Sequence, residues 1–335
     1  MKLNLKQIKS ITQGAAYITA DESGIQFHRF NEAEETYYKS TSHSTKTFST
    51  SGIQMVFKTD ADKLSMKANV SVASTRKFFS FDIYINGELS GEFKNYKHEE
   101  MHLPYSLQEC ELGDFSWEMP MKEGEKTLRI VFPFGSKPTI SEISLENATF
   151  IEPVKRSKTM LMYGDSITHG YDALNPSRAY AVQLAHALDA EAINKAIGGE
   201  VFRSELSAIK NDINPDYITV AYGTNDWSKR TKEAAESDCR GFYENLRKNY
   251  PDAKIFAITP IWRGDMDNET KFGKFSDAIK MIHTVCEEIG GITVIDGFEF
   301  VPAKEEFFAD LRLHPTNEGF DLYAASLLRE IEKYI

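Results

Sequence analysis

Hydrophobic and polar residues follow different patterns in the two halves of the chain. In roughly the first 150 residues, short runs rich in aromatic and β-branched residues recur at residues 52–57, 78–85 and 127–132. Runs of this length and composition are typical of β-strands. The Asn86-Gly87 pair lies between two apolar segments and is a strong signal for a hairpin. Because long amphipathic helices are absent from this half, the pattern predicts an antiparallel β-sandwich of jelly-roll type over residues 1–153.

From residue 154 onward, segments with strand-like and helix-like patterns alternate. The expected strands are at residues 160–163, 192–194, 217–222, 255–259 and 293–295. The expected helices are at residues 178–188, 232–249, 271–289 and 318–334. Strands separated by helices of this length imply right-handed crossovers and a parallel sheet that is covered on both faces. Residues 154–335 are therefore predicted to form an α/β domain whose ligand site lies beyond the carboxyl ends of the strands.

The composition narrows the class of protein. A length of 335 residues suggests about two domains. The formal charge of −11 is spread along the chain, which disfavours nucleic acid and anionic lipid surfaces as partners and favours a neutral small-molecule substrate. No segment approaches the ~18 consecutive apolar residues of a membrane span. The first residues lack the apolar core of a secretory signal, so we expect a protein that is cytoplasmic or already processed. The sequence leaves the oligomeric state open, a homo-oligomer included.

Metal and cofactor chemistry has no support in the sequence. Cys110, Cys239 and Cys286 lie far apart, which is typical of free thiols in a reducing compartment. The eight histidines show no metal-ligand spacing, either with one another or with the cysteines. We therefore expect neither a metal nor an organic cofactor.

Residues 162–170, Met-Tyr-Gly-Asp-Ser-Ile-Thr-His-Gly, carry the most specific signal in the chain. They place Ser166 where an apolar strand gives way to a tight turn, a position at which serine can act as a nucleophile. A serine hydroxyl needs a base to take its proton and donors to receive the oxyanion. The alternative is that Ser166 only caps the following helix.

Three later blocks supply residue types suited to those roles. They are Asn-Lys-Ala-Ile-Gly-Gly at 194–199, Tyr-Gly-Thr-Asn-Asp at 222–226 and Asp-Leu-Arg-Leu-His-Pro-Thr-Asn at 310–317. All four blocks follow expected strands, the last one after the final strand. Because the carboxyl ends of parallel strands meet at one edge of a sheet, we expect the blocks to converge there.

In their order and separation, the four blocks resemble those of the SGNH hydrolases, the GDSL-type esterase and lipase superfamily. The resemblance covers roughly residues 157–335 and implies a three-layer, flavodoxin-like hydrolase fold. It assigns the nucleophile to Ser166 and the general base to His314. It assigns the oxyanion donors to the backbone N–H groups of Ser166 and Gly199 and the side-chain amide of Asn225.

The chemistry of these residue types agrees with the resemblance. Glycine lets a backbone N–H approach the substrate where a Cβ would intrude. The alternative is that Gly199 is a simple turn glycine. Gly198 beside it also leaves open which of the two glycines is the donor. Asn225 donates hydrogen bonds without a titrating charge, although an Asx turn would also explain it. His314 is suited to taking the serine proton and returning it to the leaving alcohol.

Asp310 departs from the family pattern. Family members place the aspartate three residues before the histidine, whereas here Leu311 is inserted and the acid lies four residues before His314. A bulge at the extra residue would leave Asp310 able to orient the imidazole. A backbone carbonyl, or the carboxylate of Glu305 or Glu306, is the alternative.

Five further residues are predicted to line the substrate pocket: Asp165, His169, Trp227, Trp262 and Arg263. Asp165 and His169 flank the proposed nucleophile, and the other three follow expected strands, so they should overhang the same crevice. Aromatic walls suit the apolar faces of sugar rings, although tryptophans near a sheet edge as often serve packing.

These observations predict a serine esterase that acts through a covalent acyl-enzyme. A β-sandwich followed by an SGNH domain is similar in layout to two-domain carbohydrate esterases, and no apolar lid helix stands out. We therefore expect a short acyl group, acetyl above all, on a sugar or oligosaccharide. The alternatives are a lysophospholipase or thioesterase of the same superfamily, and a carbohydrate-binding protein without catalysis.

Overall fold

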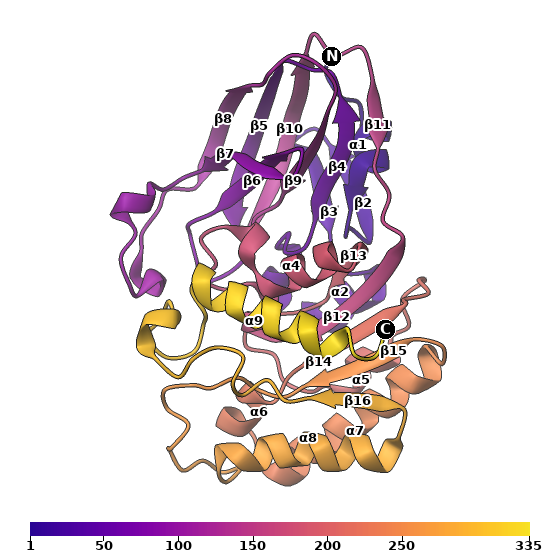
Figure 1. The fold of residues 1–335 in the computed structure, drawn as a ribbon, viewed down its shortest axis with the longest axis vertical. Coiled ribbons are helices and arrows are strands. Elements are labelled where there is room, and N and C mark those ends of the chain that lie inside the picture. The colour runs from indigo at the N-terminus through magenta and orange to yellow at the C-terminus, as the bar shows by residue number, and fades with distance from the viewer.

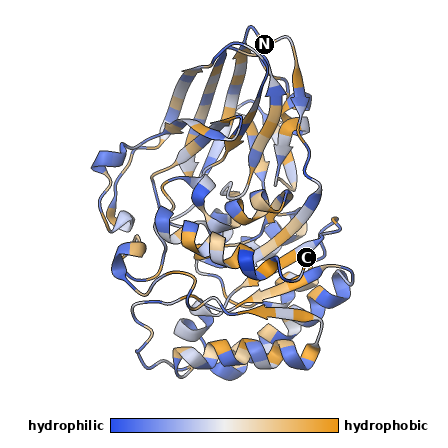
Figure 2. Ribbon diagram, viewed as in Figure 1, coloured by the Kyte–Doolittle hydropathy of each residue, from blue (hydrophilic) through white to orange (hydrophobic).

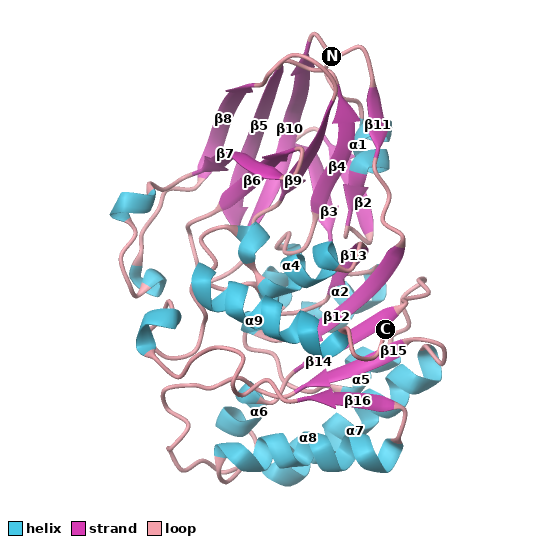
Figure 3. Cartoon of the chain, viewed as in Figure 1, coloured by secondary structure: helices cyan, strands magenta, loops and turns pink.

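The computed structural model describes residues 1–335 and contains three β-sheets. Two antiparallel sheets lie in the N-terminal part, and one parallel sheet with helices on both faces lies in the C-terminal part (Figure 1; Figure 3). The predicted fold class, an antiparallel sandwich followed by a three-layer α/β hydrolase fold, is confirmed. The division at residues 153 and 154 stays a prediction.

The two antiparallel sheets form a structure that we call the sandwich. One sheet has the order β1 (Thr12–Gln13), β4 (Gln54–Thr59), β9 (Lys126–Val131), β6 (Ser80–Ile85) and β7 (Glu88–Lys94), with β11 (Ile151–Pro153) also paired to β4. The other has the order β2 (Tyr17–Asp21), β3 (Gly24–His28), β10 (Ser136–Glu146), β5 (Lys63–Val72) and β8 (Gly113–Pro120). Alternate residues of β5, such as Leu64 and Met66, join one core between the sheets. This period of two is what places one face of a strand in the core.

The predicted hairpin is present between β6 and β7. Asn86 and Gly87 have positive φ angles of 52° and 88°, and Ile85 pairs with Glu88 across the turn. Two consecutive positive φ angles define the type I′ turn that Asn-Gly favours.

The sequence pattern missed the short helices of this half. The structure has α1 (Leu5–Ile11) and α2 (Glu32–Lys39), and 3₁₀ turns at Ser44–Phe48, His98–Glu100 and Tyr105–Leu107. Both α-helices begin at capping boxes, in which an asparagine and a residue three positions on exchange hydrogen bonds. Helices this short are marginal by themselves, so packing of buried residues such as Ile8 in α1 and Tyr38 in α2 must supply most of their stability.

The parallel sheet has the order β13 (Ala190–Asn194), β12 (Lys158–Gly164), β14 (Tyr217–Ala221), β15 (Lys254–Ile258) and β16 (Ile292–Ile295). In chain order this is 2-1-3-4-5, the flavodoxin-like arrangement. Helices α4 (Tyr180–Ala187) and α9 (Asn317–Ile331) cover the face toward the sandwich, whereas α5 (Ser204–Ala208), α7 (Lys232–Asn249) and α8 (Phe275–Ile289) cover the other (Figure 1).

Each face of the parallel sheet has its own core. In β12, Leu161 and Tyr163 pack toward α7 and α8, and Met160 and Met162 pack toward α4 and α9. Because both faces are buried, the parallel strands are hydrophobic along most of their length (Figure 2). No helix of the structure has the length and hydrophobicity needed to span a bilayer.

Buried polar contacts fasten the sandwich to the parallel-sheet region. Asp82 of β6 accepts hydrogen bonds from the backbone N–H and the hydroxyl of Ser177, at 2.9 and 2.6 Å. Arg29 donates to the carbonyl of Asn194 at 2.7 Å. Lys195 and Glu34 form a fully buried ion pair at 2.6 Å. Breaking a buried pair of this kind costs about 3–5 kcal/mol, so the two parts are expected to hold a fixed orientation.

Candidate active site

Ser166 begins a short helix at the carboxyl end of β12. The side chain of Asp165 caps this helix, α3 (Ser166–His169), by accepting from the backbone N–H of Ile167 at 2.9 Å. The turn needs glycine at position 164, because a Cβ there would lie 2.6 Å from the Cβ of Thr168. The sequence therefore folds into a tight strand-to-helix turn that holds Ser166 at the edge of the sheet.

His314 meets Ser166 across 148 positions of sequence. The hydroxyl Oγ of Ser166 lies 2.8 Å from Nε2 of His314. With the ring proton on Nδ1, the hydroxyl donates to Nε2, which is the contact that a general base makes with a nucleophile. Ser166 is 5% exposed, and the side chain of His314 is 13% exposed, so little of either reaches solvent.

Asp310 reaches His314 because the extra residue bulges outward. Leu311 has a φ of 61° and is partly exposed, so the chain loops out at the inserted position. Oδ1 of Asp310 accepts from the backbone N–H groups of Arg312, Leu313 and His314 at 3.1, 2.7 and 3.0 Å. Oδ2 of Asp310 lies 2.9 Å from Nδ1 of His314. The carboxylate is thus fixed by the bulge while its other oxygen faces the imidazole.

The alternative acids lie elsewhere. Glu305 and Glu306 belong to an exposed 3₁₀ turn and make no contact with His314. Of the candidates that the sequence left open, the geometry favours Asp310 as the group that orients the ring.

A second carboxylate, Asp172, also faces the imidazole and was missed from the sequence. Its Oδ2 lies 3.3 Å from Nδ1 of His314, and its side chain is fully buried. Arg76 of the sandwich binds both oxygens of Asp172, at 2.5 and 2.9 Å. Asp172 has a φ of 69°, a conformation that non-glycine residues rarely adopt and that tends to mark functional sites. Arg76 is 96 positions away from Asp172, so no local pattern could have revealed the contact.

The two carboxylates share one ring N–H. The N–H of His314 is aligned with neither oxygen, although both lie within ion-pair distance. Burial lowers the pKa of His314, but the close carboxylates of Asp172 and Asp310 favour the charged ring, outweigh burial and raise the pKa to about 9. Burial would raise the pKa of Asp310, but the interactions with His314 and the backbone N–H groups lower it below its usual range.

Asp172, Asp310 and His314 are also residue types that bind divalent cations, and their ligand atoms lie within 4.8 Å of one another. However, Arg76 already binds both oxygens of Asp172, and Nδ1 faces both carboxylates. A cation would have to displace an arginine, so the set fits an ion-paired imidazole better than a metal centre.

Gly199 lies in the loop that follows β13, with a φ of 90°. A Cβ at this position would meet no atom closer than 3.5 Å, so the positive φ, and not a lack of room, is what requires glycine. Two lysines hold this loop: Lys46 of the sandwich donates to the carbonyl of Gly198 at 2.5 Å, and Lys229 donates to that of Gly199 at 2.7 Å. Sequence reasoning missed both lysines, because neither lies in a recognisable motif.

Asn225 lies in the first turn of α6 (Thr224–Lys229), directly after β14. Its Nδ2 donates to the carbonyl of Glu200 at 3.0 Å. The amide therefore faces the glycine loop and has a second N–H for another acceptor. The structure thus brings the serine turn, the glycine loop, Asn225 and His314 to one edge of the sheet, beyond β12, β13, β14 and β16.

The sequence suggested that His169 lines the substrate pocket, but the structure places it elsewhere. It is fully buried, with Nε2 at 2.9 Å from both the hydroxyl of Ser49 and the carbonyl of Phe134. Its Nδ1 accepts from the backbone N–H of Gly198 at 3.2 Å. The prediction of a pocket wall is wrong, because this ring instead supports the glycine loop.

Trp227 and Arg263 are also buried, at 1% and 3% exposure. Nε1 of Trp227 donates to the carbonyl of Gly273, and the guanidinium of Arg263 lies 4.8 Å from the Trp227 ring centroid. Arg263 also forms an ion pair with Asp265 and donates to the carbonyl of Thr224, so both side chains have partners inside the structure, and their predicted contact with substrate stays a prediction. Asp165, 2% exposed, is likewise occupied as a helix cap. Trp262 is half-buried against Phe308, so its predicted role stays a prediction.

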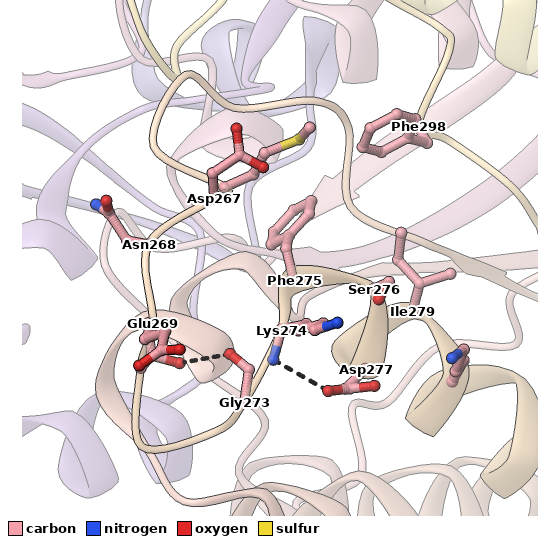
Figure 4. Close-up of a pocket in the computed structure, with 13 residues that line it drawn as sticks. Asp267, Asn268, Glu269, Gly273, Lys274, Phe275, Ser276, Asp277, Ile279 and Phe298 are labelled. Carbon is pink, nitrogen blue, oxygen red and sulfur yellow. Dashed lines mark hydrogen bonds between the residues drawn. The ribbon is translucent and has the colours of Figure 1, made fainter.

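A large cavity elsewhere in the molecule does not coincide with this site. It measures about 980 Å³ and lies between the loop at residues 266–274 and the start of α8 (Figure 4). Phe275 and Phe298 line it together with acidic residues such as Asp267, and none of the residues around Ser166 reaches it. Volume alone would therefore misplace the active site.

Comparison with known proteins agrees with this geometry. Residues 162–322 match the family described as GDSL-like lipase/acylhydrolase. No curated protein is significantly similar to the chain in sequence.

The whole fold is similar to that of solved structures. Salicylyl-acyltransferase SsfX3 from a tetracycline biosynthetic pathway is 18% identical, with a TM-score of 0.78 over 96% of this chain and 94% of that one. A protein described as a GDSL-like lipase from Bacteroides ovatus is 18% identical, with a TM-score of 0.78 over 99% and 97%. Est2A, an acetyl xylan esterase from the rumen bacterium Butyrivibrio proteoclasticus, is 15% identical, with a TM-score of 0.63 over 99% and 98%.

At such low identity the likeness concerns the fold, and it includes the sandwich as well as the parallel sheet. The family match covers the part of the chain that contains the serine turn, the glycine loop, Asn225 and His314. Over residues 162–322, this chain is similar to the GDSL-like lipase/acylhydrolase family.

Proposed function

We propose that the protein is a serine esterase that removes short acyl groups, acetyl above all, from carbohydrates. The observation that carries this proposal is the 2.8 Å contact between Oγ of Ser166 and Nε2 of His314 within the family segment. A serine without such a base is a poor nucleophile at neutral pH.

The mechanism begins with proton transfer from Ser166 to Nε2 of His314 as Oγ attacks the ester carbonyl. The tetrahedral oxyanion accepts hydrogen bonds from the backbone N–H groups of Ser166 and Gly199 and from the amide of Asn225. His314 then protonates the departing alkoxide, and a water molecule deacylates the serine by the same steps in reverse order. Asp310 stabilises the imidazolium that forms in each half-reaction.

A short acyl group and a sugar alcohol are supported by two observations. The nearly complete burial of Ser166 suits a small acyl group better than a long chain. The fold, sandwich included, is similar to that of the acetyl xylan esterase Est2A. Acyl transfer to an acceptor other than water is a second candidate, because the fold of the salicylyl-acyltransferase is more similar, with a TM-score of 0.78 against 0.63 for Est2A.

Acetate release from acetylated xylo-oligosaccharides tests this proposal. The wild type should release acetate, and its turnover of nitrophenyl esters should fall steeply from acetate to octanoate. Ser166→Ala should lose about 10³-fold or more in kcat with an unchanged melting temperature, because the residual rate relies on binding alone. Ser90→Ala, a change at an exposed serine of β7, is the matched control and should keep full activity.

Product analysis separates the alternatives. Preference for octanoate or for thioesters would contradict the acetylesterase proposal and favour a lysophospholipase or thioesterase. Acylated alcohol in place of free acetate, when an acceptor alcohol is added, would favour the transferase. No turnover of any ester by folded protein would favour a binding protein.

A further inference from the structure

A second cavity, of about 620 Å³, lies where the sandwich meets α4. The sandwich contributes Tyr84 and Arg129 to its wall, the segment after β11 contributes Arg156, and the other region contributes Arg178, His186 and Asp321. In Figure 1 this is the junction between β6, β9 and α4. No residue around Ser166 lines it, so it is separate from the proposed active site. Its volume is that of a site for a small molecule.

The cavity is positively charged in a chain whose formal charge is −11. Three arginines line it against one carboxylate, Asp321. That carboxylate is already bound by Arg178, through both Nε and Nη2. The charge of Arg129 and the buried donors of Arg156 therefore still need an explanation.

Arg129 is a buried cation without a carboxylate partner. It is 9% exposed, and its Nε donates to Oε1 of Gln54 at 2.7 Å. The guanidinium carbon lies 5.4 Å from the Tyr84 ring centroid, and Nη2 has no hydrogen-bond partner. A buried, unpaired charge is costly, and native proteins normally supply a counter-ion or a ligand. Burial and the charge of Arg156 lower the pKa of Arg129 to about 10, so it stays charged at neutral pH.

Arg156 presents a similar surplus of donors. Nη1 lies 3.2 Å from Oδ1 of Asp189, which is largely exposed, and Nε is buried without a partner. Nη2 donates to Nδ1 of His186 at 2.9 Å, which requires that ring nitrogen to be unprotonated. Burial and then the charges of Arg129 and Arg156 lower the pKa of His186 to about 4, in agreement with that contact. The wall of the cavity therefore carries positive charge, and two of its buried N–H donors, Nη2 of Arg129 and Nε of Arg156, have no acceptor.

We propose that this cavity binds an anionic small molecule whose phosphate or carboxylate oxygens accept hydrogen bonds from Arg129 and Arg156. Guanidinium groups match both oxyanions because two parallel N–H groups can bind two oxygens. The Tyr84 ring offers a flat surface for the body of such a ligand. This site lies outside the proposed esterase chemistry and holds whether or not that function is correct.

Calorimetric titration of the full chain tests the site. The probes are inorganic phosphate, glucose 6-phosphate and glucuronate, with glucose as the neutral control. We expect saturable binding of at least one anion and none of glucose. The phosphate and carboxylate arms show which oxyanion the site selects.

Variants locate the binding. Arg129→Gln and Arg156→Gln should each weaken the bound anion about 10-fold or more, because each removes charged hydrogen bonds to it. Arg240→Gln changes the same residue type on the surface of α7, where its partners are Glu236 and Glu288, and should leave affinity unchanged. Arg156→Gln decides the matter if Arg129→Gln does not fold. Failure of all three anions to bind, or equal affinity in wild type and Arg156→Gln, would overturn the proposal.

Discussion

The two sides of Ser166 carry opposite charges. On the imidazole side, the carboxylates of Asp310 and Asp172 lie within 3.3 Å of the ring nitrogen that faces away from the serine. On the oxyanion side, the ammonium groups of Lys46 and Lys229 bind the carbonyls of the glycine loop. Acyl transfer develops positive charge on the imidazole and negative charge on the substrate oxygen. Each side therefore holds the charge that would stabilise the proposed transition state.

The sandwich takes part in both sides. Arg76 fixes Asp172 on the acidic side, and Lys46 fixes Gly198 on the basic side. The parallel sheet supplies the reacting groups, whereas the sandwich supplies their supports. The N-terminal part is therefore built into the site, and single substitutions can change one side at a time.

The largest effect is expected from the acidic side. Asp310→Asn should lower kcat/KM by about 10²–10⁴-fold at pH 7, because the amide no longer stabilises the imidazolium and can hold the wrong tautomer. Steady-state kinetics on nitrophenyl acetate measure this loss. Glu305→Gln, which removes an exposed carboxylate that the sequence left as an alternative, should have no effect. Equal losses in the two variants would contradict the assignment of Asp310.

Asp172→Asn should cost less, about 10-fold in kcat/KM, because Asp310 still faces the ring. The pH dependence of kcat/KM shows whether Asp172 acts on the imidazole. The base must be neutral to act, so wild-type kcat/KM should rise with pH through the His314 pKa of about 9. Removing one of the two carboxylates lowers that pKa, so the rise should move to lower pH.

The matched control is Asp60→Asn, which changes a half-buried aspartate of the sandwich that is paired with Thr149. It should leave the profile in place. An unmoved profile in Asp172→Asn, with only a lower melting temperature, would reduce Asp172 to a structural role.

The smallest effect is expected from the basic side. Lys46→Met keeps the length of the side chain and removes the charge, and kcat should fall roughly five-fold, or about 1 kcal/mol, as the glycine loop loses one charged hydrogen bond. KM should change little, because the loop acts on the transition state. Lys39→Met, an exposed lysine at the end of α2, is the control. A change in KM alone would mean that Lys46 binds substrate instead.

The sequence predicted the parallel-sheet region well because its signals are local. The strand β12, the turn at Ser166 and the glycine at position 199 each follow from neighbouring residues, and α7 begins and ends at the expected positions. The hairpin at Asn86 was also predicted from neighbouring residues, because the Asn-Gly pair alone favours its turn.

The supporting contacts could not be predicted, because they join residues far apart in the chain. Arg76 and Asp172 are 96 positions apart, and Lys46 and Gly198 are 152 apart. Burial was the other missing quantity: Trp227 and His169 are residue types suited to a pocket wall, and only the packing around them shows that they are interior.

The most direct test of the central claim is covalent labelling of the nucleophile. Incubation with a fluorophosphonate, followed by peptide mass spectrometry, should find one modified residue, Ser166. The labelling rate should rise with pH toward the His314 pKa of about 9 and fall by orders of magnitude in His314→Ala. Labelling at another residue, or at the same rate without His314, would contradict the account.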